Sequence, residues 1–154
     1  MSRGNWVDAD FSGLKNLYDK FSSSNMQRCK FIGSDLSGLL LKSNNVDSCD
    51  FSSSDISNSH IQSSNLANNL FKDCSLKETE FSRSNINGCD FSGTDFTGVT
   101  FQNATLINTF FKNKSLKRIR FVDCQVDRIT YAFLKNGKAD LTGITLLAPK
   151  EGNE

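Results

Sequence analysis

The sequence has a single histidine, His60, among its 154 residues, together with five cysteines. One histidine and regularly spaced cysteines form no zinc-binding pattern and no Cys–His pair for nucleophilic catalysis. His60 falls at a position that we expect to face solvent, where a lone histidine is far more often a surface residue than a catalytic one. Phosphate-binding and dinucleotide-binding glycine motifs are also missing. We therefore expect no metal, no cofactor and no enzymatic activity.

Long apolar runs are missing as well. Hydrophobic residues make up 37% of the chain, and no run approaches the length of a membrane span. The segment 1–11 lacks the apolar stretch after a basic start that marks a signal peptide. The sequence predicts a single-domain cytoplasmic protein without a membrane partner, while a domain of a secreted effector stays open.

What the chain has instead is an apolar residue at every fifth position. The register runs without a failure from Phe21 to Tyr131. A step of five spreads side chains around a helix and alternates the two faces of a strand, so neither element gives a continuous apolar face. The backbone must therefore turn once every five residues, which is typical of a solenoid.

The kind of apolar residue repeats at four times this period. One set of centres at steps of twenty is entirely aromatic and includes Phe31, Phe51, Phe71, Phe91 and Phe111. The set half a coil away also carries large residues, whereas the two other sets are mostly aliphatic. This pattern predicts a square coil of four five-residue sides, with an interior filled in layers.

The cysteines keep the same register. Cys29, Cys49, Cys74, Cys89 and Cys124 are separated by multiples of five, and each lies two residues before an apolar centre. Most other residues at this phase are small, so we expect a second, tighter inward position where cysteine acts as a small buried hydrophobe. A disulfide between Cys29 and Cys49 stays open beside the simpler interpretation of reduced structural thiols.

With these features the chain resembles the pentapeptide-repeat proteins, whose motif is A(D/N)LXX. Close matches are Ser34–Gly38, Cys49–Ser53, Cys89–Gly93 and Ala139–Gly143. The resemblance spans roughly residues 4–131. It implies an all-β solenoid, a right-handed quadrilateral β-helix of about six 20-residue coils. It implies little about function, because one fold hosts many functions.

The register breaks near both ends. Asn16 stands where an apolar centre belongs, which predicts a distorted first coil, and Asn136 interrupts the series again. We expect residues 1–131 to form the repeat region and residues 132–154 to form an irregular C-terminal cap. The cap is either a last coil or a short helix, and it would cover exposed strand edges. No such device precedes Trp6, which leaves open an uncapped first coil, a partner there or a longer chain.

The net charge of +1 hides an uneven distribution. Residues 43–110 carry eight acidic and three basic side chains, whereas residues 111–138 carry eight basic and two acidic ones. The candidate residues for docking a partner at this basic end are Lys112, Lys117, Arg118, Arg120 and Arg128. Such a charged end steers a partner electrostatically. The alternative is a solvated surface that only resists aggregation.

Several apolar residues fall at outward positions of the register. Leu70 and Phe110 share one column, two coils apart, and Phe133 and Leu134 follow in the capping segment. These four residues are candidates for a dimer or cap surface, although scattered exposed apolar residues are also normal. A homodimer through the C-terminal end therefore stays open.

The intact scaffold and the missing catalytic residues favour a non-catalytic protein–protein interaction module, either alone or as a domain of a larger bacterial protein. The resemblance also implies an alternative, a DNA-mimicking protein of the quinolone-resistance type that binds topoisomerases such as DNA gyrase. Here the acidic stretch is modest, the C-terminal end is basic and no loop interrupts residues 21–131, which departs from that type. We expect a protein partner and no direct contact with nucleic acid.

Overall fold

The structure is a computed structural model that describes residues 4–112 and 115–148. Strands of three residues follow one another along the chain, and one helix, α1 (Arg128–Asn136), lies near the C-terminus. The strands are β1 (Asn5–Val7), β2 (Asn25–Gln27), β3 (Leu40–Lys42), β4 (Asn45–Asp47), β5 (His60–Gln62), β6 (Asn65–Ala67), β7 (Glu80–Ser82), β8 (Asn85–Asn87), β9 (Thr100–Gln102), β10 (Thr105–Ile107), β11 (Arg120–Val122), β12 (Cys124–Val126) and β13 (Ile144–Leu146).

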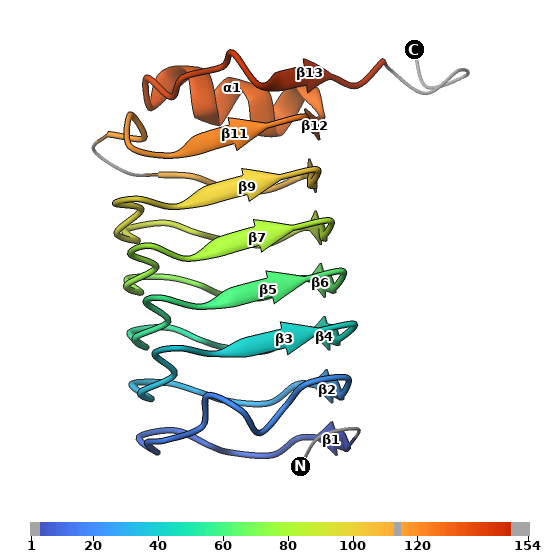
Figure 1. The fold of residues 1–154 in the computed structure, drawn as a ribbon, viewed down its shortest axis with the longest axis vertical. Coiled ribbons are helices and arrows are strands. Elements are labelled where there is room, and N and C mark those ends of the chain that lie inside the picture. The colour runs from blue at the N-terminus through green and yellow to red at the C-terminus, as the bar shows by residue number, and fades with distance from the viewer. Residues whose placement is uncertain (1–3, 113–114, 149–154) are drawn as a thin grey trace.

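Two walls of the rod are parallel β-sheets (Figure 1). One sheet has eight strands in the order β1-β2-β4-β6-β8-β10-β12-β13, and the other has five in the order β11-β9-β7-β5-β3. Neighbouring strands are offset by twenty residues, as in the pairing of Leu41 with Ile61. On the remaining walls, isolated bridges such as Asp35–Asp55 join equivalent positions. The chain therefore rises as a right-handed, four-sided coil, which confirms the predicted fold class. It has about seven turns, one more than the six predicted.

Most five-residue sides end in a corner where the backbone adopts positive φ. The angle is 66° at Gly33, 59° at Ser43 and 56° at Asn68, a region that glycine and asparagine enter most readily. Aspartate shapes the side before such a corner, because Oδ1 of Asp35 accepts the backbone N–H and the hydroxyl of Ser37 at 3.1 and 2.7 Å. This side-chain turn explains why aspartate recurs just before the apolar centres.

The centres of the five-residue register fill the interior. Every centre from residue 21 to residue 126 is buried. Phenylalanine rings stack along the axis, with centroids 4.8 Å apart for Phe31 and Phe51 and 4.9 Å apart for Phe51 and Phe71. The predicted aromatic column thus runs from residue 11 to residue 111, and its rings repeat at the spacing between hydrogen-bonded strands.

The residue two places before each centre is a second inward position, and it also links the coils by hydrogen bonds. Ser59 Oγ accepts the backbone N–H of Leu39 at 2.9 Å, and Asn69 Oδ1 accepts that of Cys49 at 2.8 Å. The position therefore satisfies buried N–H groups, a role that small apolar filling alone does not provide. All five cysteines are free and buried, which supports reduced thiols over a disulfide between Cys29 and Cys49.

The first coil is distorted where the register fails. Asn16 is exposed and has φ of 62°, while the next residue, Leu17, is buried in its place. The step between inward residues is thus six from Phe11 to Leu17 and four from Leu17 to Phe21. The slip leaves Tyr18 half exposed on the surface. The predicted distortion is therefore a shift of one residue, after which the register recovers.

The C-terminal cap combines a helix with a partial coil, the two forms that the sequence left open. The side chain of Asp127 caps α1 by accepting a backbone N–H of the first turn. The last regular centre is Val126, so the prediction that the five-residue register continues to Tyr131 is wrong: Tyr131 is a half-buried residue of α1. The helix spans both sides of residue 131, where we expected the repeats to end. Lys114 and residues 149–154 lie outside the described residues.

Candidate interaction surface

The described part of the chain holds no cluster of metal-ligating side chains. Within residues 4–112 and 115–148, no three His, Cys, Asp or Glu side chains are grouped so that they could hold a metal ion. His60 is exposed at the start of β5, with Leu40 and Glu80 as its register partners. No helix in these ranges is long and apolar enough to cross a membrane.

The aspartates that precede the apolar centres are engaged in their own turns. Asp95 Oδ1 accepts the backbone N–H and the hydroxyl of Thr97 at 3.0 and 2.7 Å. Asp90 Oδ1 accepts the same two groups of Ser92 at 2.9 and 2.6 Å. The hydrogen bonds from Thr97 lower the pKa of Asp95. These carboxylates stabilise turns, and the structure does not pair them as a general acid and base.

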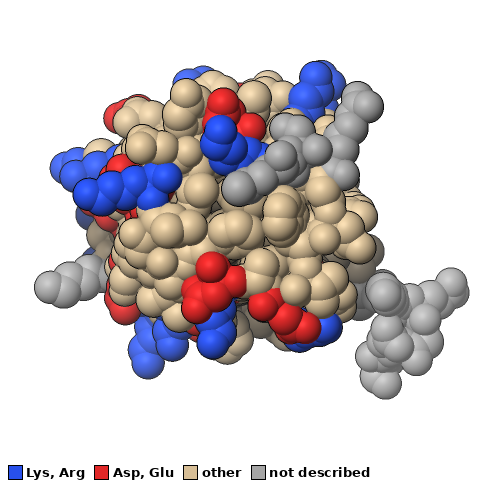
Figure 2. Space-filling view, turned by 90° about the horizontal axis from the view of Figure 1, so that it is seen from below, with Lys and Arg blue, Asp and Glu red and all other residues tan. Residues whose placement is uncertain are grey.

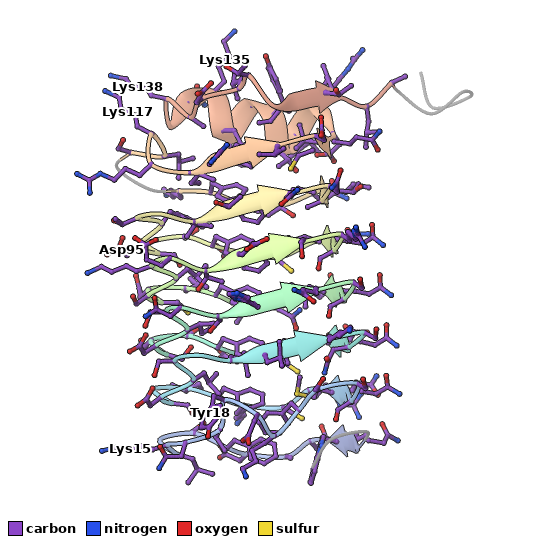
Figure 3. All side chains as sticks on the ribbon, in the orientation of Figure 1. Lys15, Tyr18, Asp95, Lys117, Lys135 and Lys138 are labelled. Carbon is purple, nitrogen blue, oxygen red and sulfur yellow. The ribbon has the colours of Figure 1, made fainter. Side chains whose placement is uncertain are left out.

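Six basic residues gather at one corner of the C-terminal end. We call this set the basic corner, and it comprises Lys112, Lys117, Arg118, Arg120, Lys135 and Lys138. The backbone N–H of Leu116 donates to the carbonyl oxygen of Gly137 at 2.8 Å, which places the next residues, Lys117 and Lys138, beside each other. In Figure 3, Lys117 and Lys138 project from the upper left edge of the rod, and Lys135 projects from its top beside the helix.

Two shallow clefts join the members of the basic corner. A cleft of about 520 Å³ is lined by Lys117, Arg118 and Arg120 together with Asp123 and Asp140. A second cleft of about 620 Å³ is lined by Lys112 and Arg118 together with Asp95. Because Arg118 lines both clefts, it connects the basic residues of one cleft to those of the other, and bases outnumber acids in each.

Among the described residues, no salt bridge involves the basic corner. The ion pairs lie elsewhere, as between Arg28 and Asp8 at 2.8 Å and between Lys77 and Asp95 at 3.6 Å. Acidic and basic side chains are interspersed around the rim of the N-terminal end (Figure 2). The two ends of the rod therefore differ in charge distribution. Within the described residues, no ion pair compensates the positive charge of the basic corner at the C-terminal end.

Four of the five predicted docking residues belong to the basic corner, and Arg128 does not. Arg128 is the first residue of α1, and Lys135 follows seven positions later, about 10 Å along the helix axis. Lys135 and Lys138 take part instead, and neither was predicted from the sequence as a site residue. In the sequence, only their position within the basic stretch 111–138 pointed to them. The five-residue register does not predict where the residues of a helix lie.

The structure divides the predicted apolar surface. The rings of Phe110 and Phe133 pack with centroids 4.6 Å apart, and Phe110 remains 49% exposed. Leu134 is fully buried, so it belongs to the interior of the cap and not to an exposed surface. Leu70 shares the wall of Phe110, but Asp90 lies between them in the stack. Of the four predicted residues, Phe110 and Phe133 therefore form the one apolar contact pair near the cap, where Ile129 and Leu146 are also exposed.

A family model of the pentapeptide repeat region matches residues 24–100 and 64–141, which together cover most of the chain. The chain belongs to the pentapeptide-repeat family. No curated protein matches the sequence.

Several solved pentapeptide-repeat structures are similar to this family member. Rfr23 from the cyanobacterium Cyanothece is 16% identical, with a TM-score of 0.66 over 71% of this chain and 89% of that one. A pentapeptide-repeat protein of the Arabidopsis thaliana thylakoid lumen is 23% identical, with a TM-score of 0.41 over 69% and 74%. Full-length QnrB1, described as a plasmid-mediated fluoroquinolone resistance protein, is 17% identical, with a TM-score of 0.37 over 96% and 93%. The match to Rfr23 shows the fold, and the other two carry no argument.

Proposed function

We propose that this pentapeptide-repeat protein is a non-catalytic scaffold that binds a protein partner through the basic corner. The observation that carries the proposal is the absence of ion pairs at the basic corner among the described residues. Like charges held close together repel one another, so a partner that brings negative charge relieves the repulsion and is steered toward this end.

The remaining reactive groups support a non-catalytic role. Burial raises the pKa of the Cys49 thiol to about 12, and those of Cys74 and Cys89 to about 11. A thiol with so high a pKa is almost entirely protonated at neutral pH and is a poor nucleophile. The aspartates that accept hydrogen bonds within their turns are likewise committed to the scaffold.

A binding experiment from a bacterial lysate tests the proposal. The wild-type chain is compared with Lys117→Glu/Arg118→Glu and with a control, Lys42→Glu/Lys72→Glu, in which two exposed bases outside the basic corner are reversed. We expect a protein that the wild type and the control recover and that the corner variant loses. Equal recovery of every protein by all three chains would overturn the basic corner as the docking site.

The basic corner also favours a different protein over a second copy of this chain. In a two-fold symmetric dimer each contact surface meets its own copy, so a dimer through the C-terminal end would bring two basic corners toward each other. We expect a monomer at low salt by light scattering. A stable dimer that survives low salt would replace the proposed partner by a second copy.

The topoisomerase-binding alternative depends on the aspartates along one wall of the rod. Asp35, Asp55 and Asp95 stand in one column with Ser75, but Lys77 pairs with Asp95 and interrupts the run of negative charge. If this alternative holds, DNA gyrase is recovered by the wild type and by the corner variant, and Asp35→Asn/Asp55→Asn loses it. The opposite pattern, loss only in the corner variant, supports the scaffold proposal.

A further inference from the structure

We infer that the basic corner, together with the Phe110–Phe133 pair, binds an acidic and partly apolar extended segment of a protein partner. This inference rests on the proposed function and goes further, because it names the chemistry of the partner. Two observations support it. Among the described residues, the bases of the last coil and cap form no salt bridges, and the aromatic pair on the adjoining wall is exposed.

The charges define one half of the ligand. Lys117, Arg118 and Arg120 line one cleft, and Lys112 shares a second cleft with Arg118. Carboxylates are the groups that guanidinium and ammonium ions bind most directly in proteins, and Arg118 can present its planar fork to a carboxylate that approaches from either cleft. A segment with several carboxylates can therefore satisfy both clefts at once.

The aromatic pair defines the other half. Phe110 and Lys112 flank the inward-facing Phe111 on one wall, so their side chains point outward about 7 Å apart. Phe133 of α1 packs against Phe110 at 4.6 Å and thereby fixes its ring. An apolar side chain of the bound segment can cover these rings while the neighbouring carboxylate reaches Lys112, as alternate side chains of an extended segment do.

The acidic groups around the corner limit the length and class of the ligand. Asp90 lies directly beneath Phe110 in the stack, and the column of Asp35, Asp55 and Asp95 continues down another wall. A long nucleic acid needs cations spread along its backbone, but here Asp95, Asp123 and Asp140 already line the clefts of the corner, and further carboxylates follow down the rod. A short acidic peptide segment fits within the corner, and a long polyanion would meet repulsion along the rod.

Direct binding to a defined probe tests the inference. The probe is a labelled peptide of about twelve residues, in which glutamate alternates with leucine or phenylalanine, so that it can span both clefts in extended form. One comparison peptide has serine in place of the apolar residues, and another comparison is single-stranded DNA of the same net charge. Fluorescence anisotropy with the full chain at low and high salt gives each affinity, and circular dichroism checks that each variant is folded.

We expect the alternating peptide to bind the wild type and to weaken at high salt, because salt screens exposed charges. Lys117→Glu/Arg118→Glu should weaken it by about tenfold or more, whereas Lys42→Glu/Lys72→Glu should change it by less than about twofold. Phe110→Ser should weaken it by about three- to tenfold. Leu70→Ser, an outward position on the same wall beyond Asp90, should leave it unchanged.

Three results would overturn the inference. They are equal peptide binding by the corner variant and its control, equal binding of the serine peptide, and DNA binding as tight as that of the alternating peptide. The proposed function fails separately: if the lysate experiment yields a partner that the corner variant loses while no acidic peptide binds, the scaffold role stands and only the partner chemistry is wrong.

Discussion

Leu116 donates its backbone N–H to the carbonyl oxygen of Gly137 at 2.8 Å, and this bond fastens the last regular coil to the end of α1. The approach is close because position 137 has no side chain. A Cβ added there would lie 2.4 Å from Cδ1 and 2.6 Å from Cγ of Leu116, which is itself fully buried. The seam between coil and cap, where the basic corner is assembled, thus depends on one glycine and one leucine.

Gly137→Ala should therefore destabilise the cap, by about 1–3 kcal/mol, the usual range for overpacking a filled site. Urea unfolding followed by circular dichroism measures the loss. Leu116→Ala alone should cost about 2–5 kcal/mol because it opens a cavity. Since it also makes room for the added methyl group, the double variant should be more stable than the sum of the two single losses predicts. Additive losses would contradict the proposed close packing.

The aromatic column gives a second prediction. Phe71 stacks on Phe51 and Phe91 at 4.9 Å on both sides, so Phe71→Ala should cost about 3–5 kcal/mol of unfolding free energy. Phe11 has a stacked neighbour on one side only, Phe31 at 5.2 Å, and retains 8% exposure, so Phe11→Ala should cost less. Chemical denaturation of the two variants compares them, and a larger loss for Phe11→Ala would contradict the nearest-neighbour view of the stack.

A third prediction concerns a row of asparagines on the outer face of the eight-stranded sheet. Asn65 donates to Asn45 Oδ1 and accepts from Asn85, each at 3.0 Å. Asn65→Ala should therefore lower the unfolding free energy by about 1–2 kcal/mol, since two hydrogen bonds are lost at once. Asn87→Ala is the matched control, because Asn87 is exposed on the same wall and its side chain forms no hydrogen bond within the described residues. Equal losses would show that the row contributes nothing.

The sequence predicted the repeating part of the fold because one local rule, an inward residue every five, recurs in every coil. The prediction failed where the position of a residue depends on contacts outside its own five-residue repeat. Asn16 marked a distortion, but only the structure shows that Leu17 takes the inward place. Tyr131 kept the register in the sequence, yet it lies in α1, which begins after the Asp127 cap.

The candidate site shows the same limit. Lys112, Lys117, Arg118 and Arg120 belong to the regular coil, so their clustering could be predicted from the register and the charge. Lys135 and Lys138 join them only because the helix turns the chain back against the last coil. That placement is a tertiary effect, set by the packing of Gly137 on Leu116, and no five-residue pattern encodes it.

The buried thiols lead to a prediction about alkaline pH. Burial raises the pKa of Cys49 from an ordinary value of 9.0 to about 12, and it raises those of Cys74 and Cys89 to about 11. Above pH 9 the unfolded chain releases these protons while the folded chain keeps them. The unfolded state then binds fewer protons, so stability should fall as the pH rises from about 9 to about 11. Each thiol contributes up to about 1.4 kcal/mol per pH unit in that window.

Urea unfolding across this window measures the slope, and the control is the triple variant Cys49→Ala/Cys74→Ala/Cys89→Ala. Lysine and tyrosine side chains also titrate at alkaline pH, but they are the same in both chains, so the difference between the two slopes isolates the thiols. The variant should be less stable at neutral pH, because it loses buried volume, and flatter above pH 9, because it has lost the three shifted groups. Equal slopes would mean that the unfolded chain holds these thiols as firmly protonated as the folded one, and the burial of the three cysteines would then have no consequence for stability at high pH.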